Sequence, residues 1–180
     1  MSCNHGYSFR YPETCHFSCN HGYHLYAGST SRTCRADRTW SGSAARCCPG
    51  GYKYYQPSQL CYKAFNQQSD YTSAAATCSS GGGTLAIPRD AGINTFLINL
   101  KNAVDSKAWF WFGLTDRDQE GSWVWADGVA LGHFNQWGPG RPDNATKNED
   151  CALYWPQKDN KWSDFPCSET SLKFICQVGT

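Results

Sequence analysis

Residues 149–167 read EDCALYWPQKDNKWSDFPC, and this stretch decides the fold expected for the second half of the chain. A short apolar run, ALYW at 152–155, lies between two cysteines, with acidic residues before and after it. Short apolar runs that are rich in aromatic residues are typical of buried strands. The stretch therefore predicts a strand with carboxylates close to its ends.

The residues upstream of this stretch predict two helices and then more strands. Asp70 can cap a helix over residues 71–78 that stops at the glycines 81–83. Asp90 can begin a second helix, whose apolar face combines Ile93, Phe96, Leu97, Leu100 and Val104. Further strand-like runs follow at 109–114, 122–125 and 172–176. Helices followed by strands predict an α+β fold.

The segment between Trp125 and Cys151 is a long connection rich in Gly, Pro, Asn and Asp. Loops of this length in a compact domain are usually functional or disordered. Residues 137–150, WGPGRPDNATKNED, gather several carboxylates and amides. Oxygen ligands of this kind on a loop are what calcium prefers. The loop is therefore a candidate calcium site.

Composition narrows the class of protein. The chain has 180 residues, too few for a long multidomain enzyme, and its formal net charge of +1 gives no field that would attract nucleic acid or an anionic membrane. Eleven cysteines predict a disulfide framework and an extracellular location, either secreted or in the ectodomain of a cell-surface protein. No apolar stretch is long enough to span a membrane. The odd cysteine count and the lack of a signal peptide would both follow if the chain is a fragment of a longer protein.

The chain changes character at the Cys47-Cys48 pair, which we take as a domain boundary between 1–47 and 48–180. The first segment has five Arg, no Lys and two acidic residues, whereas the second has eleven basic and thirteen acidic residues. Short runs at 24–26 and 31–33 predict strands, so the first segment should be a small, disulfide-bonded all-β unit. A zinc site is the alternative for its cluster of Cys and His, yet the spacing fits no common four-ligand pattern.

The second segment resembles a C-type lectin-like domain over residues 48–177. The features that coincide are Cys48 and Cys61 in a starting hairpin, Trp111-Phe112-Gly113-Leu114 where the family has Trp-Ile-Gly-Leu, Pro142, Glu149-Asp150-Cys151, and Trp162-Ser163-Asp164 before Cys167. This resemblance implies two helices, antiparallel strands and a long loop. It also implies the disulfides Cys48–Cys61, Cys78–Cys176 and Cys151–Cys167.

The first segment resembles a partial sushi (complement control) module of the selectin type. The residues that carry this resemblance are Cys19-Asn-His-Gly-Tyr-His-Leu, Cys34, Thr39-Trp40-Ser41-Gly42 and Cys47. The resemblance implies the disulfides Cys3–Cys15 and Cys19–Cys47. It leaves Cys34 without a partner, because the matching cysteine would lie upstream of Met1.

Sugar-binding members of the lectin family hold one loop calcium, and two sugar hydroxyls complete its coordination. The resemblance places Arg141, Asp143, Glu149, Ser163 and Asp164 at this sugar-type position. Only the three acidic residues match the family's ligands, because a guanidinium has no lone pair to offer and a Ser hydroxyl coordinates weakly. A bidentate pair between Arg141 and Asp143 or Glu149 would make Arg141 an internal substitute for the ion.

A second, auxiliary calcium position of the family corresponds to five residues of this chain: Asp116, Glu120, Asn144, Glu149 and Asp150. The alternative for these acidic residues is a solvated loop face, or salt bridges with Arg117 and Lys147. Residues 144–146 also form an N-glycosylation sequon, and a glycan there would cover the loop.

These features predict a carbohydrate-recognition module, with calcium as the candidate cofactor and glycans or glycoproteins as partners. The alternative is a lectin-like domain that binds a protein partner without calcium or sugar. An enzyme is not expected, because His133 is the only histidine of the second segment and no catalytic triad pattern stands out. Trp109, Trp111, Trp123 and Trp125 are expected in the core. Trp137 and Trp155 lie nearer the loop, where an exposed ring can stack on a sugar.

Overall fold

A computed structural model describes residues 2–3 and 11–179 of the chain, with side chains from residue 11 onward. The described chain divides into two compact units, one ending at Tyr54 and the other comprising residues 55–179. The boundary at 47/48 stays a prediction, because compactness alone does not show where an independently folding module begins.

The first unit is all-β, as expected for the sushi-like segment. β1 (Ser2–Cys3), β2 (Thr14–His16) and β4 (Ser31–Thr33) form one antiparallel sheet, and β3 (Tyr23–Ala27) pairs with β5 (Arg46–Pro49). The expected disulfide Cys19–Cys47 is present, and Cys34 is buried with a free thiol. Cys15 is also disulfide-bonded, so the two thiolates that a zinc site would use are absent. The side chain of Cys3, the expected disulfide partner of Cys15, lies outside the described residues.

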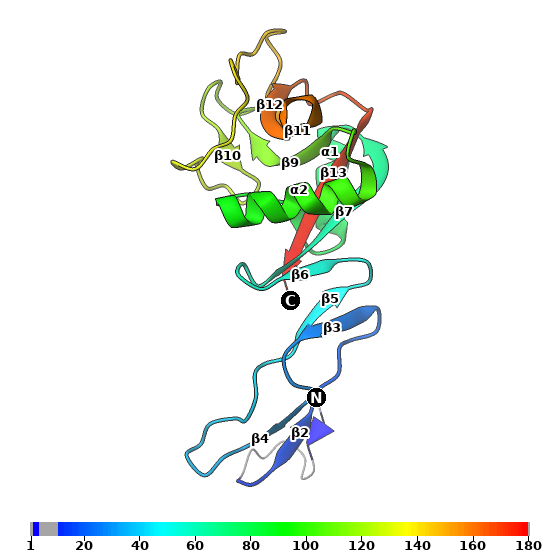
Figure 1. Cartoon of the computed structure of the whole chain (residues 1–180), viewed down its shortest axis with the longest axis vertical. Helices are drawn as coiled ribbons and strands as arrows, with labels where there is room; N and C mark the ends of the chain where they lie inside the picture. The colour runs from blue at the N-terminus through cyan, green and yellow to red at the C-terminus, as the bar shows by residue number, and fades with distance from the viewer. Residues whose placement is uncertain (1, 4–10, 180) are drawn as a thin grey trace. The chain divides into compact units, whose positions relative to one another are not determined.

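The second unit is built on one sheet with the strand order β12-β11-β9-β13-β7-β6 (Figure 1). Two short strands join it, β8 beside β13 and β10 beside β9. The strands are β6 (Lys53–Tyr55), β7 (Leu60–Ser69), β8 (Thr84–Leu85), β9 (Phe110–Thr115), β10 (Val124–Trp125), β11 (Cys151–Trp155), β12 (Lys161–Phe165) and β13 (Leu172–Gly179). β13 and β9 are parallel, and the other pairs in this sheet for which a register is known are antiparallel.

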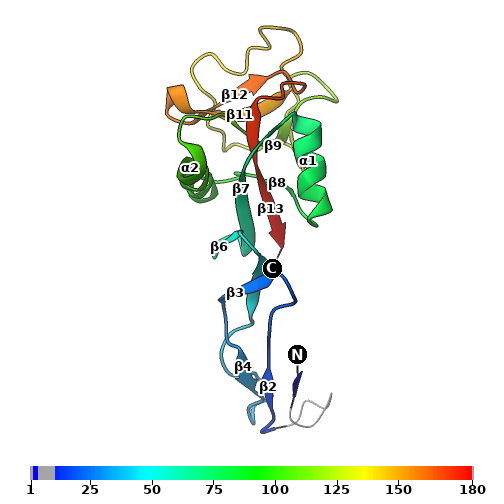
Figure 2. The same cartoon turned by 90° about the vertical axis from the view of Figure 1, so that its right-hand side faces the viewer.

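The helices α1 (Tyr71–Ser80) and α2 (Ala91–Asp105) lie on opposite sides of β7 and β13 (Figure 2). Both begin where the sequence predicts. The carboxylate of Asp70 accepts a hydrogen bond from the Ser73 amide at 2.9 Å, and that of Asp90 accepts one from the Ile93 amide at 2.8 Å. Two helices with a mainly antiparallel sheet confirm the α+β fold. A short 3-10 turn, η1 (Pro156–Lys158), joins β11 to β12.

The predicted apolar stripe of α2 is largely confirmed, because Leu97 lies in the core and Ile93, Phe96 and Leu100 pack against it. Asn94, Leu97 and Lys101 are the buried residues of this helix, and Val104 is 39% exposed. Asn94 tolerates burial because its Oδ1 accepts hydrogen bonds from the Tyr154 hydroxyl at 2.9 Å and from the Trp162 indole at 3.0 Å. A hydrogen-bonded polar side chain therefore lies on the buried face beside the apolar residues.

Aromatic side chains form much of the core that supports the loop. Trp111, Trp123 and Trp125 are buried, as expected, but Trp109 is half-buried and its indole donates to Gln157 at 2.7 Å. Trp137 packs edge-on against Trp123, with 4.7 Å between ring centroids, and so is no free stacking platform.

Disulfides tie the loop to the sheet. Cys151–Cys167 joins the start of β11 to the residues after β12, and Cys78–Cys176 joins α1 to β13 across 98 residues. Both expected pairs are confirmed. Cys48 and Cys61 are each disulfide-bonded.

Candidate functional site

The site lies where the long loop between β10 and β11 meets β12. Asp164 is on β12, Glu149 comes just before β11, and Arg141 and Asp143 belong to the loop, with a cis peptide bond between Arg141 and Pro142. The loop runs at the same end of the unit as β11 and β12 (Figures 1 and 2). Segments distant in sequence thus supply neighbouring side chains.

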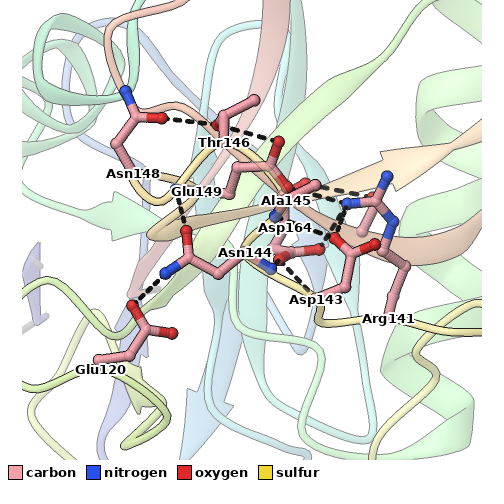
Figure 3. Close-up of polar contacts among 10 residues, drawn as sticks. Glu120, Arg141, Asp143, Asn144, Ala145, Thr146, Asn148, Glu149 and Asp164 are labelled. Atoms are coloured by element: carbon pink, nitrogen blue, oxygen red, sulfur yellow. Dashed lines mark hydrogen bonds and ion pairs between the residues drawn. The ribbon is translucent and has the colours of Figure 1, made fainter.

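Three carboxylates converge on a single nitrogen of Arg141 (Figure 3). Nη1 lies 2.7 Å from Asp143 Oδ1, 2.9 Å from Glu149 Oε2 and 3.0 Å from Asp164 Oδ1. The carboxylates approach one another closely enough to hold a metal ion, with one oxygen of each within 4.8 Å of the others. The expected contact between Arg141 and Asp143 or Glu149 is therefore present. It is not bidentate, because Nη1 alone makes all three contacts.

The buried carboxylates of this cluster depend on Arg141. The side chain of Asp164 is fully buried and that of Glu149 is 5% exposed, whereas Asp143 is 45% exposed. Burial opposes the charge of Arg141, but the hydrogen bond to Asp164 and the charges of Asp164, Asp143 and Glu149 outweigh it and raise the pKa of the guanidinium. The cation therefore stays charged at any physiological pH.

Backbone groups complete the binding of Asp164. Its Oδ2 accepts from the amides of Asp143 at 2.9 Å and of Asn144 at 2.7 Å. The Thr146 hydroxyl lies 2.6 Å from Asn148 Oδ1 and 3.1 Å from Glu149 Oε1, and it has one proton to donate between these two acceptors. Sequence reasoning missed these donors. In the sequence, Thr146 is recognisable only as part of a glycosylation motif.

Ser163 does not join the cluster. Its hydroxyl donates to the backbone carbonyl of Asp164 at 3.2 Å, and its side chain is buried. The structure thus brings together four of the five residues predicted at the sugar-type position.

The auxiliary residues form a looser group around Asp116, which is 4% exposed. One of its oxygens, Oδ2, accepts from the Gly121 amide at 2.8 Å. The other, Oδ1, is buried and has no hydrogen-bond partner among the described residues. Burial, followed by the charges of Asp150 and Asp164, raises the pKa of Asp116. Burial, then the charges of Asp116, Asp150 and Asp164, also raises the pKa of Glu120. Excess negative charge has therefore gathered here.

Asn144 connects the two groups. Its backbone has a positive φ of 43°, its Oδ1 accepts from the Glu149 amide at 3.0 Å, and its Nδ2 donates to the Glu120 carboxylate (Figure 3). The amide nitrogen, rather than the expected oxygen ligand, faces Glu120. In the described part of the chain, neither Arg117 nor Lys147 forms an ion pair with the acidic residues, so the salt-bridge alternative is wrong there.

An aromatic ring with two nearby cations and a polar cavity border the site. The guanidinium of Arg141 lies 5.6 Å above the half-buried ring of Trp155, and the Lys158 ammonium lies 5.7 Å from the same ring. On the side of Asp150, a cavity of about 500 Å³ is lined by side chains that donate or accept hydrogen bonds, including Thr72, Arg117, Asn148 and Ser168.

Comparisons with known proteins agree with this architecture. Residues 67–178 match the family model of the lectin C-type domain, and residues 1–47 match that of the sushi repeat. A perlucin-like protein of Mytilus galloprovincialis is 30% identical over 130 residues, which cover 72% of this chain and 81% of that protein. The alpha-N-acetylgalactosamine-specific lectin of Patiria pectinifera is 30% identical over 158 residues, covering 82% of this chain and 88% of that protein.

A solved structure has the same fold. The C-type lectin CEL-I from Cucumaria echinata aligns with a TM-score of 0.67 at 26% identity, covering 72% of this chain and 96% of that chain. Against three other relatives, the chain spans between 38% and 64% of their lengths. Because the lectin model matches more than half of the chain, the chain belongs to the C-type lectin domain family and carries a carbohydrate-recognition lectin module preceded by a sushi repeat.

Proposed function

We propose that this module binds glycans without a calcium ion at the sugar-type position, because Arg141 acts there as the counter-cation. The observation that carries the proposal is the placement of Nη1 between 2.7 and 3.0 Å from all three carboxylates. Glycans are the ligand class of the family, and one relative is named for its specificity toward alpha-N-acetylgalactosamine.

A guanidinium in the place of a calcium ion changes how a sugar can be bound. A calcium ion has coordination sites left for sugar hydroxyls, whereas a guanidinium offers only N–H donors. Sugar recognition then depends on hydrogen bonds to side chains. The cavity beside Asp150 supports this mode, since hydroxyls of Thr72 and Ser168 and the amide of Asn148 line it.

Calcium has a separate place in this proposal, at Asp116, Glu120, Asn144 and Asp150. The buried Asp116 Oδ1, which has no partner among the described residues, supports this location. A buried oxygen of this kind lowers the stability of the fold unless a cation or a hydrogen-bond donor contacts it. Asn144 would have to turn its amide so that Oδ1, rather than Nδ2, faces Glu120.

A glycan array with and without EDTA, combined with calcium calorimetry, tests the function. We expect glycan binding that EDTA leaves within about two-fold, and calcium binding that Asp116→Asn weakens by roughly ten-fold or more, since one lost carboxylate ligand costs at least about 1.4 kcal/mol. Asp159→Asn, at an exposed acidic residue outside both groups, is the matched control and should leave the calcium affinity nearly unchanged. Glycan binding abolished by EDTA, with calcium binding lost in Asp164→Asn, would contradict the proposal.

The second candidate is a protein partner bound at the same surface, and the same Arg141 contacts favour it, because they remove the coordination sites that hold sugar hydroxyls. An empty glycan array, with partner binding unchanged by EDTA, would select it. In both cases we assign a binding rather than a catalytic role in an extracellular protein. Among the described residues, no helix has the length and apolar character needed to cross a membrane.

A further inference from the structure

Trp155, the last residue of β11, presents an indole ring beside the Arg141 cluster. The residue is half-buried, and one edge of its ring borders the loop, since a Cβ built on Gly138 would lie 3.7 Å from Cε3. The indole N–H has no hydrogen-bond partner among the described residues. The buried polar side-chain atoms that lack a partner do not include this N–H, so it is open to solvent.

Three cationic side chains gather around this ring. The Arg141 guanidinium lies 5.6 Å from the ring centroid, and the exposed Lys158 ammonium lies 5.7 Å from it. Lys161 pairs directly with Trp155 across β11 and β12, so its side chain leaves the same face of the sheet. Its ammonium donates to Gln136 Oε1 at 2.7 Å. Within the described ranges neither lysine forms an ion pair, so both charges are available to a ligand.

Arg141 also keeps donors that the carboxylates do not use. Nη1 makes all three contacts with the carboxylates, and among the described residues neither Nη2 nor Nε has a hydrogen-bond partner (Figure 3). A guanidinium has five N–H groups in one plane, so those on Nη2 and Nε are left for another acceptor. The donors of Arg141, Lys158 and Trp155 that lack acceptors therefore lie close to one ring.

The position of the charges decides which ligand fits, because the three carboxylates and the three cations cancel in formal charge. Glu149 and Asp164 are buried on the Nη1 side of Arg141, and two backbone amides also donate to Asp164. Asp143 is more exposed, but it too is paired with Nη1. The carboxylates are thus neutralised within the cluster, whereas Lys158 and Lys161 carry charges without an ion-pair partner. An anion is the complementary ligand.

We propose that Trp155 and the cations around it form a subsite for an anionic sugar, one that carries a sulfate or a carboxylate group. One face of the sugar ring stacks on the indole, and the anionic group accepts hydrogen bonds from Lys158 and from Arg141 Nη2. The flexible, exposed Lys158 side chain can turn from the ring toward the anion. This inference rests on the proposed function for glycan binding and adds the class of glycan.

Nuclear magnetic resonance of the isotope-labelled full chain tests this subsite, because each indole N–H gives its own signal. The signal of Trp155 is the one lost in Trp155→Phe. The probes are N-acetylgalactosamine, its sulfated form, its sialylated form, and inorganic sulfate at equal ionic strength. We expect at least one of the two anionic sugars to shift the Trp155 signal and to bind about five-fold or more tightly than the neutral sugar, with a preference that salt weakens. The sugar that is preferred distinguishes a sulfate from a carboxylate as the recognised group.

Lys158→Gln and Lys53→Gln form a matched pair of variants. Each removes one exposed ammonium, but Lys53 lies on β6, at the opposite edge of the sheet from β11 and β12. Lys158→Gln should reduce the preference for the anionic sugar to about two-fold or less, with the other indole signals unchanged, whereas Lys53→Gln should keep the preference.

Four results would overturn the subsite. Equal affinities of the parent for neutral and anionic sugars would leave only the proposed function. A preference lost in Arg117→Gln but kept in Lys158→Gln would place the anion in the cavity beside Asp150. A Trp155 signal that inorganic sulfate shifts as strongly as the sulfated sugar would indicate a simple anion site. Binding of none of the sugars, together with an empty glycan array, would overturn the proposed function as well.

Discussion

Replacing Arg141 with Met is expected to lower the free energy of unfolding by about 3–5 kcal/mol, the range found when one partner of a buried ion pair is removed. The fully buried Asp164 and the 5% exposed Glu149 would both lose their cation. Urea unfolding at pH 7, followed by tryptophan fluorescence, measures the change.

Arg117→Met is the control for this prediction. Arg117 is exposed and makes a single 3.3 Å hydrogen bond to Thr72, so its replacement should change stability by less than about 0.5 kcal/mol. Millimolar calcium should also restore part of the stability of Arg141→Met but add less to that of Arg117→Met. Only the first variant leaves the three carboxylates around position 141 without their cation. An Arg141→Met variant as stable as the parent would show that the guanidinium does not support the site.

Replacing Lys101 with Met is expected to have the opposite effect, raising the free energy of unfolding at pH 7 by about 2–3 kcal/mol. The Lys101 side chain is fully buried, donates to Asn102 Oδ1 at 2.8 Å, and lies 5.5 Å from the Phe110 ring centroid. Burial lowers its pKa from 10.5 to about 8, and the charge of Asp105 offsets only part of that effect. The parent therefore holds a charged group where an apolar one fits better.

The pH dependence identifies this cause. Because the pKa of Lys101 is lower in the folded state, the folded protein binds this proton less tightly than the unfolded chain does. The destabilisation is fully present below about pH 8 and fades between about pH 8 and 10.5, so this group makes the parent more stable as the pH rises through that window. The Lys101→Met variant should lose this rise. The control, Lys173→Met, breaks the 2.7 Å ion pair with Asp105 and should give no gain at pH 7. A gain at pH 7 in Lys101→Met that persisted unchanged at pH 10 would contradict the account.

The sequence predicted the helix starts at Asp70 and Asp90, the main aromatic strands and the gathering of Asp143, Glu149 and Asp164. These features depend on local rules, such as side-chain capping and short aromatic runs, or on a specific resemblance. The burial of Asn94 on α2 could not be predicted in this way, because hydrophobic periodicity counts only apolar residues. Its amide oxygen accepts hydrogen bonds from Tyr154 and Trp162, which come from strands far away in the sequence.

The side-chain contacts within the site could not be predicted from the sequence either. The resemblance placed Ser163 at the sugar-type position, but in the structure its hydroxyl donates a hydrogen bond to the Asp164 carbonyl instead. The structure likewise shows that Arg141 uses one nitrogen for three carboxylates, and that Asn144 turns its nitrogen toward Glu120. Side-chain orientation depends on the final packing of segments that lie far apart in the sequence.

Calorimetry of calcium binding to the parent and to Arg141→Glu tests most directly whether Arg141 takes the place of calcium. The substitution removes a positive charge from among three carboxylates and adds an oxygen ligand. The account predicts that Arg141→Glu binds an additional calcium ion that the parent does not bind, and that a further Asp164→Asn change abolishes this extra binding. Tight calcium binding by the parent that disappears in Asp164→Ala, with calcium-dependent sugar binding alongside, would contradict it.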